Sequence, residues 1–151
     1  FEIGMIYRES KNSVHNYDKA LDYLTQAANK GHKEALGFLA DIYIYNKKDY
    51  KKAYDLIIKS DKDSYSICGS YGDLFYNGYY VPRDYDEAFK WYMKSFELGK
   101  TNSIYHRLGR SYYFEHGVNQ DKDKAKQYMN ISVQEDYEPA KRFYDEFFKN
   151  N

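Results

Sequence analysis

Apolar and polar positions along the chain follow a helical period that recurs in four similar segments. Each segment places an alanine four positions after an Asn or Asp, and large apolar residues then return at helical spacing. Asn and Asp favour helix N-caps because their side chains accept hydrogen bonds from the free amides of the first turn. The pattern predicts four helices, here called B helices, over about 17–30, 50–60, 85–98 and 122–135. Their predicted caps are Asn16, Asp49, Asp84 and Asp121.

A second helical pattern precedes each cap and carries a small residue at a fixed place. Glycine inside a helix costs about 1 kcal/mol relative to alanine, so a column of small residues needs a compensating reason. We expect close helix–helix contact there, where consecutive hairpins touch. The small residues are Gly4, Ala40, Gly72 and Gly109. The corresponding A helices are predicted over about 2–10, 34–46, 66–78 and 103–115.

The segment ends carry further local signals. Glu87 stands three residues after Asp84, a spacing that predicts a capping box. Gly31, Gly99 and Asp136 follow B helices where a left-handed C-cap is expected. The second segment lacks the Gly-Val pair of its neighbours, which predicts a shorter loop between its two helices.

The repeating alanines are 33, 35 and 37 residues apart, so the chain is a string of helix pairs with a period near 36. One pair cannot bury its apolar faces alone, whereas stacked pairs form a continuous core. We therefore expect an all-α solenoid that forms a single domain over 1–151. Its units are predicted at about 1–33, 34–65, 66–101 and 102–137, followed by a C-terminal capping helix at 138–149.

The stretch LGRSYYFEHGVNQDKDKAKQYM (108–129) resembles a Sel1-like repeat, with its Leu-Gly, Gly-Val, Asp and Lys-Ala positions. The third unit supplies Gly72, Phe75, Gly78, Val81, Asp84, Ala88, Trp91, Tyr92 and Gly99 of the same pattern. Sel1-like repeats are relatives of tetratricopeptide repeats. The resemblance implies a right-handed α/α superhelix that acts as an adaptor or scaffold for other proteins.

In such solenoids the A helices line the concave surface. We expect an apolar and aromatic strip flanked by charges to face away from the core there, and to bind an extended peptide or a partner helix. The alternative is that these side chains are partly buried wall residues, since tyrosine is abundant throughout the chain. The candidate partner-binding residues are Asp41, Ile44, Tyr45, Asp73, Tyr76, Asn77, Arg110, Tyr113 and Phe114.

Composition narrows the classes of function. The chain has 23 basic and 23 acidic residues, a balance that argues against a nucleic-acid-binding protein. No apolar run approaches the roughly 20 residues of a membrane span, so no membrane insertion is expected. The lone Cys68 excludes an internal disulfide framework and favours an intracellular, reducing compartment. Because the sequence begins at Phe1 within a predicted helix, we expect a fragment or a processed product.

Catalytic and metal-binding motifs are missing from the sequence. The four histidines lack ligand spacing, and there is no His-Glu-x-x-His, Ser-x-x-Lys or glycine-rich phosphate loop. We therefore expect no metal, no cofactor and no enzyme activity. Cys68 is interpreted as a small core residue, the alternative being a nucleophile paired with a distant histidine such as His106. A further alternative for the whole chain is a regulatory or targeting segment of a larger enzyme.

Overall fold

The computed structural model describes residues 14–149, and within these limits the secondary structure is helical with no strand. The elements are α2 (Val14–Asn29), α3 (Lys33–Asp41), η1 (Ile42–Lys47), α4 (Tyr50–Lys59), α5 (Tyr65–Asn77), α6 (Tyr85–Leu98), α7 (Asn102–Phe114), α8 (Lys122–Gln134) and α9 (Glu138–Phe147). The B helices are α2, α4, α6 and α8, while α3 with η1, α5 and α7 are A helices. The prediction of a first A helix that includes Gly4 falls outside the described residues.

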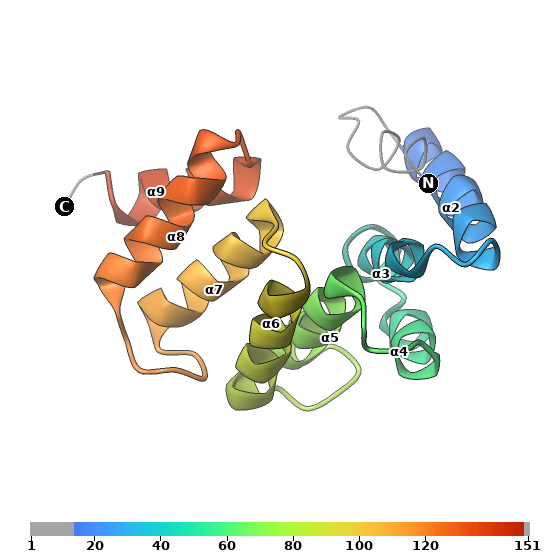
Figure 1. Ribbon diagram of the computed structural model, residues 1–151, viewed down its shortest axis with the longest axis horizontal. Coiled ribbons are helices and arrows are strands. Elements are labelled where there is room, and N and C mark those ends of the chain that lie inside the picture. The colour runs from blue at the N-terminus through green and yellow to red at the C-terminus, as the bar shows by residue number, and fades with distance from the viewer. Residues whose placement is uncertain (1–13, 150–151) are drawn as a thin grey trace.

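The helices stack in sequence order and form an arc (Figure 1). Each A helix contacts the B helix of its own pair, as α5 contacts α6 and α7 contacts α8. Neighbouring pairs meet through α3 and α5 and through α6 and α7, and α9 packs on α8. Helix α2 therefore lies at one end of the arc, α8 and α9 lie at the other, and α5 and α6 form its middle.

The core runs along the inside of the stack, and the repeated alanines lie within it. All four are fully buried, and so is the large residue one helical turn after each of them. These buried pairs are Ala20 and Leu24, Ala53 and Ile57, Ala88 and Tyr92, and Ala125 and Met129. Each pair presents the same apolar face to its A helix, which explains why the same skeleton recurs.

The small-residue column marks a close contact, but between the two helices of one pair. A Cβ added at Gly72 would lie 2.5 Å from Cε1 of Tyr92 on α6, and one added at Gly109 would lie 2.9 Å from Cε of Met129 on α8. The expectation that this column joins consecutive hairpins is therefore wrong. Consecutive A helices approach each other at another glycine: a Cβ at Gly37 would lie 2.5 Å from the carbonyl carbon of Ser66 on α5.

Replacing Gly37 by alanine is expected to destabilise the protein by about 2 kcal/mol, because the methyl group would meet the backbone of α5, which cannot move alone. Gly69 holds the equivalent place one unit later, and its added Cβ would first meet Nη1 of Arg107 at 3.3 Å. Gly69→Ala should therefore cost much less, and the gain in helix propensity offsets part of that cost. Urea unfolding of the two variants checks this, and equal losses of stability would contradict it.

Three of the four predicted N-caps are confirmed. The side chains of Asp49, Asp84 and Asp121 each accept a hydrogen bond from the backbone amide three residues later in the chain, at 3.1, 2.9 and 2.9 Å. The prediction for Asn16 is wrong, because α2 already includes it. The capping box is not found either, since the Glu87 carboxylate accepts a bond from the Trp91 indole at 3.1 Å.

The C-cap predictions are confirmed at two places. Gly31 and Asp136 have φ values of 87° and 60°, in the left-handed region. Gly99 is extended, with φ −169°, so the prediction of a left-handed cap there is wrong. A larger residue would not fit at position 99, because an added Cβ would lie 2.8 Å from Cδ1 of Tyr65.

The second unit differs from the others, as its missing Gly-Val pair predicts. Only Lys48 and Asp49 separate η1 from α4, whereas the next two units use residues 78–84 and 115–121. The predicted helix 34–46 is itself interrupted, because its second half is the π-helical turn η1. A π turn carries more residues per turn than an α-helix and so changes the direction of the side chains that follow it. Tyr45 and Asn46 belong to this turn.

Candidate functional site: a concave groove

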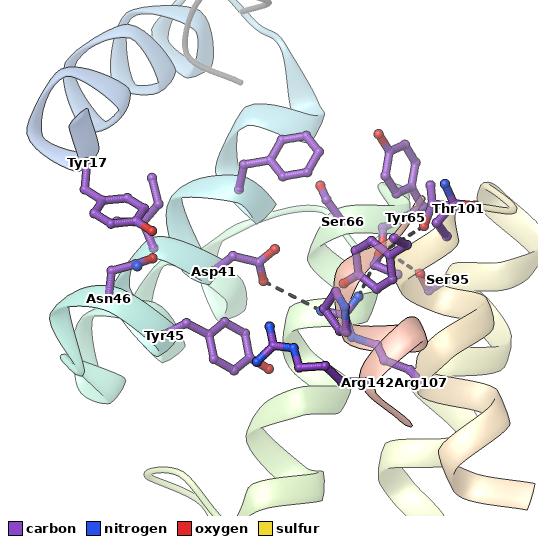
Figure 2. A pocket seen from close by; sticks show the side chains of 16 residues that line it. Tyr17, Asp41, Tyr45, Asn46, Tyr65, Ser66, Ser95, Thr101, Arg107 and Arg142 are labelled. Carbon is purple, nitrogen blue, oxygen red and sulfur yellow. Dashed lines mark hydrogen bonds and ion pairs between the residues drawn. The ribbon is translucent and has the colours of Figure 1, made fainter. Parts of the chain in front are cut away.

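The inner side of the arc is hollowed into a groove with a volume of about 680 Å³. Its lining comes from both ends of the arc, so the groove crosses the stack instead of lying within one helix pair. Tyr17 of α2, Asp41 of α3, and Tyr45 and Asn46 of η1 lie on one side, and Arg107 of α7 and Arg142 of α9 lie opposite (Figure 2).

Of the predicted partner-binding residues, only Asp41 and Tyr45 line this groove. Ile44, Asp73 and Tyr76 are buried, with 1%, 3% and 6% of their surface exposed. The prediction that they face away from the core is therefore wrong. Ile44 and Tyr76 stand four positions after the small residues of their helices, so they share the buried face.

Tyr76 belongs to a separate cluster beside the groove. Its hydroxyl lies 2.8 Å from Nδ1 of His116, and the Arg110 guanidinium lies 4.7 Å from its ring centre. Asn77 donates its side-chain amide to the backbone oxygen of Asp73 at 2.8 Å. The predicted residues Tyr76, Asn77 and Arg110 are thus satisfied within the protein and do not line the groove.

Tyr113 and Phe114 contact aromatic side chains of the capping helix α9. The ring of Tyr113 lies 5.0 Å from that of Phe147 and 5.5 Å from that of Phe143, and the ring of Phe114 lies 5.4 Å from that of Phe147. Phe114 keeps 39% of its surface exposed, outside the groove. The predicted strip is therefore divided among the core, the groove, the Tyr76 cluster and the contact with α9.

A buried ion pair lies beneath the groove and joins α5 to α7. Nε of Arg107 donates to both carboxylate oxygens of Asp73 at 2.9 and 3.0 Å, and Nη2 bonds the same carboxylate. The Tyr92 hydroxyl donates to Asp73 at 2.8 Å. The side chains of Asp73 and Arg107 are only 5% and 14% exposed, so this pair is largely removed from water.

The same network reaches α3. Asp41 lies 3.9 Å from Nη2 of Arg107 (Figure 2). It also accepts a hydrogen bond from the Ser70 hydroxyl at 2.7 Å. Nη1 of Arg107 donates to the Ser103 hydroxyl at 3.0 Å. Since the contributing residues come from three successive A helices, the network holds three units in a fixed relation.

Electrostatics keep these groups in defined protonation states. Burial opposes the charge of Arg107, but the neighbouring Asp73 carboxylate raises the pKa of the guanidinium well above its usual value. Burial and the charge of Asp73 likewise raise the pKa of Tyr92. Although half of Tyr45 is exposed, its hydroxyl end is desolvated near Asp73, and its pKa is also raised. Both phenols therefore remain protonated hydrogen-bond donors at neutral pH.

Sequence reasoning missed Arg107 and Arg142. The position of Arg107 was one available signal. It stands two residues before the small residue of its helix, where the two preceding A helices carry the uncharged residues Phe38 and Ser70. A charge at that interior position needs a buried partner, and Asp73 in the previous unit provides it. Arg142 gave no such signal, because its place on the groove depends on how α9 packs.

The other candidate residues have structural roles. Cys68 is fully buried, its thiol lies 3.7 Å from the Lys62 carbonyl oxygen, and burial raises its pKa. This environment supports its interpretation as a small core residue. Among residues 14–149, no group of three or more His, Cys, Asp or Glu side chains is placed to hold a metal ion.

Comparison with known proteins now places the chain in a family. The Sel1 repeat model matches residues 1–32, 69–100 and 105–137, which together exceed half of the chain. The chain therefore belongs to the Sel1 repeat family, whose members generally act as scaffolds for protein–protein interactions and are typically non-catalytic. No curated protein matches the sequence significantly.

Two solved structures share the fold. A protective antigen of uropathogenic Escherichia coli strains, described as displaying an SLR fold, superposes with a TM-score of 0.64 at 22% identity, over 93% of this chain and 31% of its own. A Sel1 repeat protein from Oxalobacter formigenes gives 0.53 at 26% identity, over 94% of this chain and 59% of its own. The predicted fold class, a right-handed α/α superhelix of Sel1-like pairs, is confirmed. This chain spans only part of the length of either protein.

None of the helices within residues 14–149 combines the length and apolar character that crossing a membrane requires.

Proposed function

We propose that the protein is a non-catalytic scaffold that binds an extended peptide or a partner helix in its concave groove. The observation that carries the proposal is the groove itself, which crosses several units and is lined by aromatic rings beside polar groups. The buried Asp73–Arg107 pair fixes its floor, so a partner would meet a preformed surface.

Tyr45 is the proposed anchor of this surface. It is 49% exposed, lines the groove and belongs to the π turn that distinguishes the second unit. Tyrosine combines a large apolar ring with a polar end and is enriched among the residues that dominate binding energy. The contact surface proposed here keeps Asp41 and Tyr45 from the sequence prediction and adds Tyr17, Asn46, Arg107 and Arg142.

The test is a selection of displayed random dodecapeptides on the immobilised protein, followed by affinity measurement of the best peptide by fluorescence polarisation. Tyr45→Ala is expected to weaken binding about tenfold or more, which corresponds to about 1.4 kcal/mol. Tyr80→Ala is the matched control, because Tyr80 is 54% exposed and lies outside the groove.

Circular dichroism and thermal unfolding should first establish that both variants are folded. Equal affinity of wild type and Tyr45→Ala for every selected peptide would contradict the proposed site. Failure to select any sequence-specific peptide, with partners bound only through the outer B helices, would contradict the proposed function.

A further inference from the structure

The chemistry of the groove wall formed by α7 and α9 limits which peptides fit. Two of its side chains are arginines, which donate hydrogen bonds and accept none. Asp41 is the single carboxylate among the groove-lining residues, and it is engaged by Ser70 and lies near Arg107. This part of the groove therefore offers more positive charge and donors than it offers acceptors.

The two arginines differ in how far their charge is neutralised. The Arg107 guanidinium is 14% exposed and forms its bonds with Asp73 and Ser103, so its charge is compensated inside the protein. Arg142 is 74% exposed, and its nearest carboxylate within residues 14–149 is that of Glu138, at 3.8 Å. An exposed pair at this distance is worth little, so Arg142 is available to an incoming carboxylate.

A second observation is that several arginines lie near His106, at the contact between α7 and α9. His106 belongs to α7, and its ring lies 5.8 Å from that of Tyr137, which precedes α9, and 6.3 Å from that of Phe143 on α9. Burial lowers its pKa to about 3, and the charges of Arg110, Arg107 and Arg142 contribute, while Asp73 acts in the opposite direction. Arg110, Arg107 and Arg142 thus all act on this one side chain, which lies at the contact between α7 and α9 and not among the groove-lining residues.

We propose that the groove selects an extended peptide that carries an Asp or Glu side chain, and that Arg142 binds this carboxylate. The inference rests on the proposed function and specifies its partner. A side-chain carboxylate is favoured over a C-terminal one because the groove is lined from α2 to α9, so that a chain can pass through it. Guanidinium and carboxylate form paired, charge-assisted hydrogen bonds, which give the contact a direction.

The experiment uses an array of random dodecapeptides with acetylated N-termini and amidated C-termini, probed with the wild-type protein. Peptides that bind best are expected to be enriched in Asp and Glu. Replacing the contacting Glu by Gln in the best peptide should weaken binding about tenfold, and Arg142→Gln should do the same. Combining both changes should cost little more than either alone, because both remove the same contact.

Lys90→Gln is the control variant, because Lys90 is 72% exposed and lies on the outer helix α6. It should leave the affinity unchanged within about twofold. A second array carries the same peptides with free C-termini. If peptides bind only in that second array, the assignment to a side chain is overturned. If the best peptides are neutral or basic and still lose affinity in Tyr45→Ala, this inference fails while the proposed function stands. If no peptide binds through the groove, the proposed function fails as well.

Discussion

Replacing Asp73 by alanine is expected to destabilise the protein by about 3–5 kcal/mol. The change would leave the Arg107 guanidinium in a largely desolvated position with its principal partner removed, and breaking a buried pair in this way carries costs of that size. Tyr92 would lose its acceptor as well. Urea unfolding followed by circular dichroism measures the effect.

Two further variants separate the buried pair from ordinary surface charge. Asp145→Ala removes one partner of an exposed pair with Lys149, whose side chains are 60% and 66% exposed, and should cost less than about 1 kcal/mol. The combined variant Asp73→Leu, Arg107→Met and Tyr92→Phe removes the polar network as a unit, and should recover at least half of the stability lost in Asp73→Ala. A small loss in Asp73→Ala, similar to that of the exposed pair, would contradict the prediction.

The Asp73–Arg107 pair also explains a feature of the stack. At the contact between α3 and α5, Gly37 allows the two backbones to approach closely. At the next contact, the atom nearest the equivalent Gly69 belongs to the Arg107 side chain instead of a backbone. Arg107 therefore occupies space between α5 and α7, and a polar side chain there sets the spacing of two units.

The helical architecture could be predicted from the sequence because each unit repeats the same local pattern of capping and core residues. An Asp cap, a buried alanine and a large residue one turn later follow from helix geometry, and Asp84, Ala88 and Tyr92 take the places that this geometry requires. The small column at Gly72 and Gly109 also reports a real close approach. Its assignment to consecutive hairpins failed because spacing alone does not say which neighbouring helix fills the gap.

The candidate site was less predictable, for two physical reasons. Ile44 and Tyr76 share a helix face with the small column, so their spacing already places them in the core. The π turn of the second unit, by contrast, has no signal in the helical pattern, and Tyr45 belongs to this turn, directly before the short connection through Lys48 and Asp49. Arg142 reaches the groove through the packing of a distant helix, which no local pattern records.

The stability of the protein is expected to fall as the pH decreases from about 6 to about 4, chiefly because of His106. Burial, with the charges of Arg110 and Arg107, lowers the pKa of His106 from 6.5 to about 3. Within this window the unfolded chain binds a proton that the folded protein excludes, so acid favours unfolding. A full proton changes the free energy of unfolding by about 1.4 kcal/mol per pH unit. Because the unfolded imidazole is only partly protonated at about pH 6, the loss over the window is about 2.5 kcal/mol.

Unfolding in urea at a series of pH values tests this expectation with His106→Gln, which should flatten the dependence between about pH 6 and about pH 4. Some dependence should remain, because burial and the charges of Arg110 and Arg83 also lower the pKa of His116. His32→Gln is the matched control, since His32 is exposed at the start of α3, and it should keep the wild-type slope. A slope that persists in His106→Gln but disappears in His32→Gln would show that the titrating group lies outside the α7–α9 contact.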